Sequence, residues 1–176
     1  TVPFLGDRLG FLRGQLVVIS DLFADIDGTR VQLGPSPFTA IPLLDGSIGL
    51  VDRRQPSLRV LNSGGTLSQR TPLTAPELKQ FQTSDFELSV IDAATIDDHL
   101  LVAAAPYNPL EGARILRFSS RGQLKESLRV AMPEVPELAG SASGRMSVSR
   151  IATVGTRLFL ASTTPSALRV VYCDLK

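Results

Sequence analysis

Apolar residues occur along this chain in short runs of strand length, separated by turns rich in glycine, asparagine and aspartate. Residues 15–20 (QLVVIS) are rich in β-branched side chains, and residues 29–33 (TRVQL) alternate between apolar and polar positions, so both predict β-strands. A helix is predicted at residues 75–82, where Thr74 and Glu77 have the spacing of a capping box. That segment is too short to form a layer, so the pattern favours an all-β fold.

One pattern, made of a turn, an apolar run and then a strand that carries arginine, occurs three times. The arginines of the three copies, Arg59, Arg114 and Arg169, follow one another at intervals of 55 residues. A fixed period of this size is typical of stacked supersecondary units, and here the units are made of strands. Asp45-Gly46 in the first copy predicts a tight hairpin turn, because glycine tolerates the positive φ that such turns need.

The repeats divide the chain into an N-terminal arm and a repeated part. We expect residues 1–37 to be irregular, with one or two strands. The repeated part, residues 38–176, is expected to hold three sheets at about residues 38–72, 86–131 and 148–176.

The stretch DGSIGLVDRRQPSLRVLNSGGTL at residues 45–67, echoed at 98–124, resembles the blades of bacterial six-bladed and NHL-type β-propellers. The resemblance covers about residues 38–176 and implies antiparallel four-stranded repeats. Three repeats are fewer than the roughly 4–8 blades of a closed propeller. The resemblance therefore implies an incomplete, propeller-like set of sheets, whose edges and apolar faces need a partner. A compact β-sandwich or barrel is the alternative fold.

The composition excludes several classes of function. The chain has 18 basic and 17 acidic residues scattered along its 176 positions, which gives no basic patch for nucleic acid. No apolar run approaches the ~20 residues of a transmembrane helix. Cys173 is the only cysteine, which rules out an intrachain disulfide and favours a small buried side chain. A cleaved export signal would explain the start at Thr1, as would a shortened sequence; we expect a periplasmic or secreted protein.

Two polar clusters resemble catalytic groups. Residues 25–29 (DIDGT) are similar to the first motif of the haloacid dehalogenase-type phosphatases, in which residues matching Asp25 and Asp27 act as nucleophile and acid–base beside Mg²⁺. That family needs a parallel sheet with intervening helices, so we interpret the motif as an Asp-Gly hairpin turn. His99, next to Asp97-Asp98, is the only histidine and is interpreted as part of a solvated turn. No catalytic, cofactor-binding or metal-ligating residue is therefore predicted.

These observations favour a non-catalytic protein-binding or scaffold module, an accessory subunit of a larger assembly, with homo-oligomers as a further option. We expect binding through the irregular loops at residues 106–112 and 133–144 and through the N-terminal residues 1–12. The arginines of the repeat could meet carboxylates of a partner or cover sheet edges. The candidate protein-binding residues are Tyr107, Asn108, Leu110, Glu111, Arg59, Arg114 and Arg169.

Two alternatives remain open. The chain could be a fragment of a complete β-propeller that binds a small ligand or hosts an enzyme site in its channel. More remotely, it could be a phosphatase that uses Asp25 and Asp27.

Overall fold

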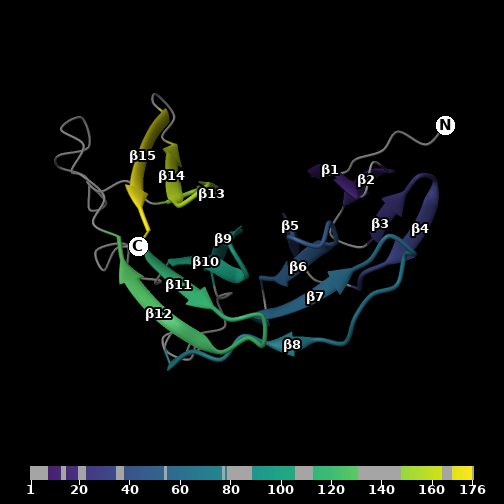
Figure 1. Ribbon diagram of the computed structural model, residues 1–176, viewed down its shortest axis with the longest axis horizontal. Coiled ribbons are helices and arrows are strands. Elements are labelled where there is room, and N and C mark those ends of the chain that lie inside the picture. The colour runs from purple at the N-terminus through teal and green to yellow at the C-terminus, as the bar shows by residue number, and fades with distance from the viewer. Residues whose placement is uncertain are drawn as a thin grey trace. The chain divides into compact units, whose positions relative to one another are not determined.

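The computed structural model describes residues 8–12, 15–19, 23–34, 38–53, 55–76, 78, 89–105, 113–130, 148–163 and 168–175. These residues form antiparallel sheets in two compact units, Thr1–Pro72 and Leu73–Lys176 (Figure 1). The prediction of an all-β fold built from antiparallel repeats is confirmed. Within the described part of the chain, no helix is long and apolar enough to cross a membrane.

The first unit contains two four-stranded sheets, in which strands that follow one another in sequence are also neighbours in space. Sheet 1 consists of β1 (Arg8–Leu12), β2 (Gln15–Ile19), β3 (Phe23–Ile26) and β4 (Thr29–Gln32). Sheet 2 consists of β5 (Phe38–Pro42), β6 (Ile48–Asp52), β7 (Ser57–Leu61) and β8 (Thr71–Pro72).

Sheet 1 corrects the expectation of an irregular N-terminal arm with one or two strands. The strands expected at residues 15–20 and 29–33 correspond to β2 and β4, whereas β1 and β3 lack the repeated pattern of turn, apolar run and arginine that marked the equally short strands of sheet 2. They form a sheet because one face packs against sheet 2. The buried side chains of this contact are Val17, Ile19, Ala24 and Ile26 from sheet 1 and Phe38, Ile48, Leu50 and Leu61 from sheet 2.

The second unit contains sheets 3 and 4. Sheet 3 consists of β9 (Ser89–Ile96), β10 (His99–Ala105), β11 (Arg114–Phe118) and β12 (Leu124–Arg129). Among the described residues, sheet 4 has three strands, β13 (Arg150–Val154), β14 (Arg157–Thr163) and β15 (Leu168–Asp174). Of the helix predicted at residues 75–82, Pro76 and Leu78 have helical backbone and Ala75 does not, while Glu77 and residues 79–82 lie outside the described residues.

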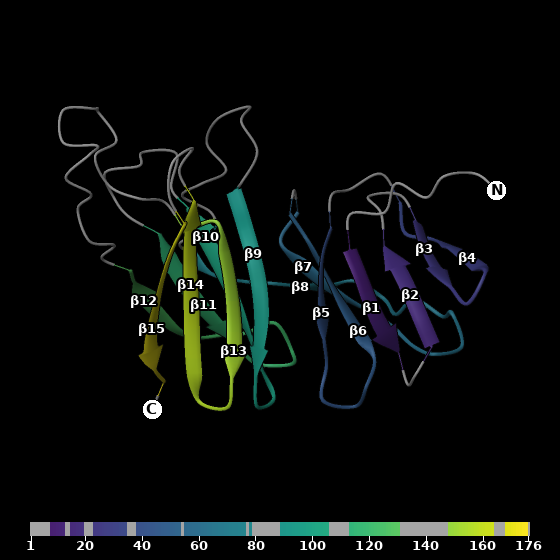
Figure 2. The same cartoon turned by 90° about the horizontal axis from the view of Figure 1, so that it is seen from above.

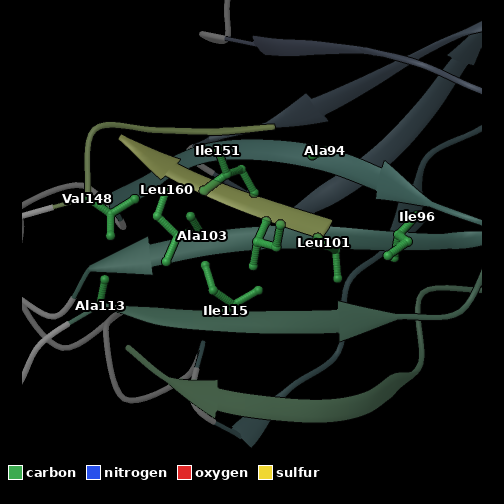
Figure 3. Packing of buried hydrophobic residues seen from close by; sticks show 10 residues of the cluster. Ala94, Ile96, Leu101, Ala103, Ala113, Ile115, Val148, Ile151 and Leu160 are labelled. Carbon is green, nitrogen blue, oxygen red and sulfur yellow. The ribbon is translucent and has the colours of Figure 1, made fainter. Parts of the chain in front are cut away.

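Sheets 3 and 4 are joined by an apolar layer (Figure 3). Sheet 3 contributes Ala94, Ile96, Leu101, Ala103 and Ile115, together with Ala113 just before β11. Sheet 4 contributes Ile151, Leu158 and Leu160, together with Val148 just before β13. Their first strands, β9 and β13, lie side by side (Figure 2). The buried carboxylate of Asp92 accepts a hydrogen bond of 3.0 Å from the backbone N–H of Ile151, and the Thr153 hydroxyl donates to the carbonyl oxygen of Thr95.

Candidate protein-binding face

The face of sheet 4 that points away from sheet 3 is apolar and open to solvent. Side chains alternate between the two faces of a strand, and the pairing of β13, β14 and β15 brings the members of one set into line. Ala152 pairs with Phe159, and Ala161 pairs with Val170. We call this surface the outer face of sheet 4 and define it by Ala152, Val154, Phe159, Ala161, Leu168 and Val170.

Polar and aromatic groups border the outer face. The ring of Tyr172 lies 6.0 Å from that of Phe159, and the guanidinium of Arg157 lies 5.3 Å from the centre of the Tyr172 ring. Arg157 also forms an ion pair of 2.9 Å with Asp174. This pair is exposed on both sides, so it adds little stability and leaves the centre of the face apolar.

The repeat relates the outer face of sheet 4 to the face of sheet 3 that binds sheet 4. Strand pairing matches Ile115 of sheet 3 with Val170 of sheet 4, since each pairs with an alanine, Ala103 or Ala161, of the preceding strand. By the same register, the six residues of the outer face correspond to six buried members of the layer in Figure 3, namely Ala94, Ile96, Leu101, Ala103, Ala113 and Ile115.

The equivalent residues of the two faces differ in how much of each side chain is exposed to solvent. Ala113 and Ile115 are 7% and 1% exposed, because sheet 4 covers them. Their counterparts Leu168 and Val170 are 67% and 57% exposed. Monomeric proteins seldom leave a contiguous apolar surface of this kind uncovered. The outer face of sheet 4 thus has the pattern of a docking face, but no sheet of the described residues is docked on it.

One polar position differs between the two faces. Asp92 and Arg150 are equivalent, because they pair with the equivalent residues Ala103 and Ala161. Asp92 accepts the hydrogen bond that joins sheet 3 to sheet 4, whereas the exposed Arg150 offers only donors. A surface that docks on sheet 4 would therefore need an acceptor near Arg150.

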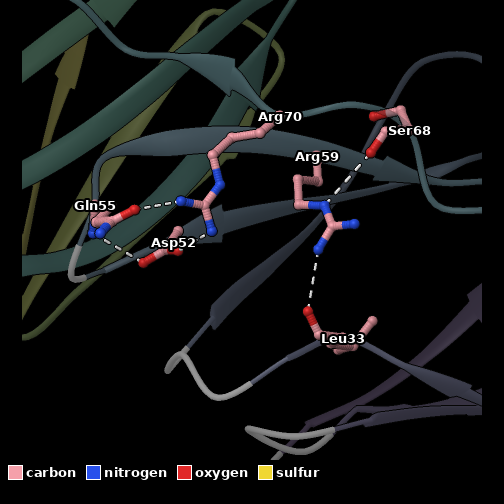
Figure 4. A network of polar contacts seen from close by, with 6 residues as sticks. All are labelled: Leu33, Asp52, Gln55, Arg59, Ser68 and Arg70. Carbon is pink, nitrogen blue, oxygen red and sulfur yellow. Dashed lines mark hydrogen bonds and ion pairs between the residues drawn. The ribbon is translucent and has the colours of Figure 1, made fainter.

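Arg59 has a structural role in the first unit (Figure 4). Its guanidinium donates to the carbonyl oxygens of Leu33, at 3.0 Å, and Ser68, at 3.4 Å, so it ties sheet 2 to the end of sheet 1. Burial lowers the pKa of Arg59, the charge of Arg70 lowers it further, and Asp52 acts in the opposite direction. Arg70 itself pairs with the buried Asp52 at 3.2 Å.

Arg114 and Arg169 do not belong to the outer face of sheet 4. Arg114 and Arg169 occupy equivalent places on β11 and β15, and Arg169 points to the opposite side of its strand from Val170. Tyr107, Asn108, Leu110 and Glu111 lie outside the described residues, as do residues 133–144. The role of all these residues in binding stays a prediction.

The polar clusters that resemble catalytic groups belong to hairpin turns. The carboxylate of Asp25 accepts a hydrogen bond of 2.9 Å from the N–H of Gly28, and Asp27 and Gly28 have positive φ of 52° and 84°. This is the turn between the antiparallel strands β3 and β4, as interpreted from the sequence. His99 contacts Asp98 at 2.6 Å beside the β9–β10 turn. Among the described residues, no three His, Cys, Asp or Glu side chains are grouped to hold a metal ion.

Cys173 is exposed, which corrects the expectation of a buried thiol. It lies near the end of β15, the last strand of the described part of sheet 4, where few neighbours cover it. The sequence reasoning also missed the outer face itself. A signal was present, since the alternating apolar residues Leu168 and Val170 occupy positions equivalent to the packed Ala113 and Ile115.

No protein-family model and no curated protein matches this sequence. Among solved structures, a catalytically inactive virginiamycin B lyase from Staphylococcus aureus with quinupristin matches with a TM-score of 0.59 and 12% identity, over 97% of this chain and 57% of the lyase. A streptogramin B lyase matches with a TM-score of 0.52 and 13% identity, over 99% of this chain and 57% of that protein.

A luciferin-regenerating enzyme also matches, with a TM-score of 0.50 and 16% identity, over 87% of this chain and 52% of its own length. This chain therefore spans somewhat more than half the length of these structures. Identities this low establish the fold alone. The resemblance to propeller blades is confirmed by these matches, and the chain has the fold of part of a β-propeller.

Proposed function

We propose that this chain is a non-catalytic protein-binding module that holds a partner protein against the outer face of sheet 4. The observation that carries the proposal is the contrast in exposure between Leu168 and Val170 and their buried equivalents, Ala113 and Ile115. The same architectural position is a sheet-to-sheet contact in one case and is open to solvent in the other.

The chemistry of the face supports a protein partner. Full burial of an aliphatic or aromatic side chain contributes about 1.5–3 kcal/mol, so covering Val154, Leu168, Val170 and Phe159 would provide much of the affinity of a stable complex. Only the surplus over the cost of association appears as affinity, and a flat sheet needs little reordering on binding. The apolar centre with an ion pair at its border also has the usual anatomy of a protein interface.

Catalysis has less support among the described residues. Asp25 and His99 are held in turns by local contacts, and no metal cluster accompanies them. The names of the similar structures, two lyases and a luciferin-regenerating enzyme, favour the alternative that this fold hosts an enzyme site. At 12–16% identity the comparison does not transfer their chemistry to this chain.

Photo-crosslinking from position 172 tests the proposed function. Cys173 is the only cysteine in the chain, so the double variant Tyr172→Cys with Cys173→Ser carries a single thiol, at the border of the outer face, for attachment of a benzophenone. In cells that produce the protein, we expect a crosslinked protein adduct that Val170→Lys abolishes. Leu44→Lys is the matched control, because Leu44 is an exposed apolar residue of the other unit. An adduct that persists in Val170→Lys, or the lack of any adduct, would contradict the proposal.

A further inference from the structure

We propose that Asp27 is a site of spontaneous isoaspartate formation in the folded protein, and that Asp25 limits the rate of this reaction. Asp27 precedes Gly28 in the turn between β3 and β4, and both residues are exposed. An aspartate followed by glycine is prone to this reaction, because glycine has no side chain to hinder its backbone nitrogen. The product is the substrate of methyltransferases that recognise isoaspartyl carboxylates, so the turn becomes a site of methylation.

The reaction begins at the backbone nitrogen of Gly28. This nitrogen attacks Cγ of the protonated Asp27 side chain, so that a bond between the nitrogen and Cγ forms, and the side-chain hydroxyl leaves with the amide proton as water. Water then opens the resulting cyclic imide. Addition at Cγ restores aspartate, whereas addition at the backbone carbonyl carbon of Asp27 gives isoaspartate, in which the chain runs through Cβ and Cγ. Both steps need only water.

The contacts of the turn leave Asp27 able to react once the nitrogen of Gly28 is released. Among the described residues, no hydrogen bond or ion pair holds the carboxylate of Asp27. A Cβ placed on Gly28 meets no atom within 4 Å, so the imide ring has room to form. The nitrogen of Gly28 is restrained by its hydrogen bond of 2.9 Å to the carboxylate of Asp25. Attack requires this bond to break, and a negative acceptor also disfavours loss of the amide proton, so Asp25 slows the reaction.

The chain contains a second Asp-Gly turn that provides a comparison. Residues 26–29 (IDGT) and 44–47 (LDGS) have nearly the same sequence. In the second turn both reacting groups are held. The carboxylate of Asp45 accepts hydrogen bonds from the backbone N–H and the hydroxyl of Ser47, and the glycine nitrogen donates to the carbonyl oxygen of Leu43 at 3.0 Å. We therefore expect the second turn to stay unmodified while the first reacts.

Peptide mapping of the folded chain after prolonged incubation in heavy-oxygen water tests the proposal. Each imide that opens takes up one oxygen atom from the solvent, and an isoaspartyl methyltransferase with a labelled methyl donor counts the isoaspartate. We expect label in the peptide that contains Asp27 and at least about tenfold less in the peptide that contains Asp45, where more hydrogen bonds must break.

The same measurement in urea, where both turns are unfolded, is the control for sequence. There the two dipeptides are expected to react at nearly the same rate, because their neighbours are so similar. Equal rates in the folded chain, or no reaction at Asp27, would overturn the inference. A faster reaction of Asp27 in urea as well would also overturn it, since the difference would then come from the sequence and not from the turn.

Substitutions of Asp25 test its role. Asp25→Ala is expected to raise the rate at Asp27 about tenfold, because no hydrogen bond to a charged acceptor then has to break. Asp25→Asn keeps an uncharged oxygen acceptor and is expected to raise the rate less. Arg30→Ala is the control for a loosened hairpin, because Arg30 pairs with Asp25 across the two strands but does not bind Gly28.

Two results would contradict the role of Asp25. One is a rate in Asp25→Asn equal to that of the unmodified chain. The other is an acceleration by Arg30→Ala as large as that by Asp25→Ala. Circular dichroism shows whether each variant is folded, and if Asp25→Ala is not, the comparison of Asp25→Asn with Arg30→Ala decides.

Discussion

Replacing Ile115 with alanine is expected to lower the free energy of unfolding by about 2–5 kcal/mol, whereas Val170→Ala changes it by less than about 1 kcal/mol. Ile115 is 1% exposed between sheets 3 and 4, so its truncation leaves a cavity as well as losing apolar burial. Val170 has the equivalent place in the next sheet but is 57% exposed, so alanine there opens no cavity. Urea unfolding at low protein concentration, where association is weak, measures both changes.

The two substitutions compare equivalent positions of the repeat that differ in how deeply they are buried. Both substitutions remove methyl groups at the same register of the same strand type, on β11 and β15. Equal losses of stability for Ile115→Ala and Val170→Ala would show that the outer face is already packed in the isolated chain. That result would remove the basis of the proposed binding face.

The second large effect is expected at Asp92. Asp92→Ala should lower the free energy of unfolding by about 2–3 kcal/mol, because it leaves the buried N–H of Ile151 without its charged acceptor. The carboxylate links β9 to β13, so the loss should loosen sheet 4 more than sheet 3. Hydrogen exchange, read by mass spectrometry, is expected to show faster exchange in β13 and β14 than in β10 and β11.

Asp92→Asn serves as the control for this substitution. The asparagine side chain has nearly the same shape and keeps an oxygen that can accept the hydrogen bond from Ile151. Its loss of stability is expected to be clearly smaller than that of Asp92→Ala. If the two variants lose the same stability, the contribution of Asp92 arises from its charge and not from the bond to Ile151.

Much of the fold was predictable from the sequence because the repeat combines several local signals. The arginines Arg59, Arg114 and Arg169, at a constant spacing, do lie on the third strands of sheets 2, 3 and 4. Turns such as Asp45-Gly46 marked the hairpins, and Gly46 has the expected positive φ of 78°. Local turn chemistry and strand alternation act over a few residues, so a single sequence carries them.

Half of sheet 1 and the outer face of sheet 4 were missed for different physical reasons. The strands β1 and β3 lack the pattern of the repeat, and sheet 1 acquires its stability from packing against sheet 2, which depends on tertiary contacts. The apolar residues Leu168 and Val170 were correctly placed in a strand, but sequence pattern alone does not distinguish a covered face from an exposed one. Cys173 was misplaced for the same reason, since its exposure depends on the neighbours of β15.

The claim that the outer face of sheet 4 binds protein can be tested most directly by tryptophan fluorescence of Tyr172→Trp. The chain contains no tryptophan, and Tyr172 is 63% exposed at the border of this face. In dilute solution the new indole is expected to emit as a solvent-exposed group. Its emission should shift to shorter wavelength as the chain associates with the partner captured by crosslinking from position 172, and this shift should be lost when Val170→Lys is added. Emission that stays that of an exposed indole in the presence of that partner, or that is already shifted in dilute solution, would contradict the claim.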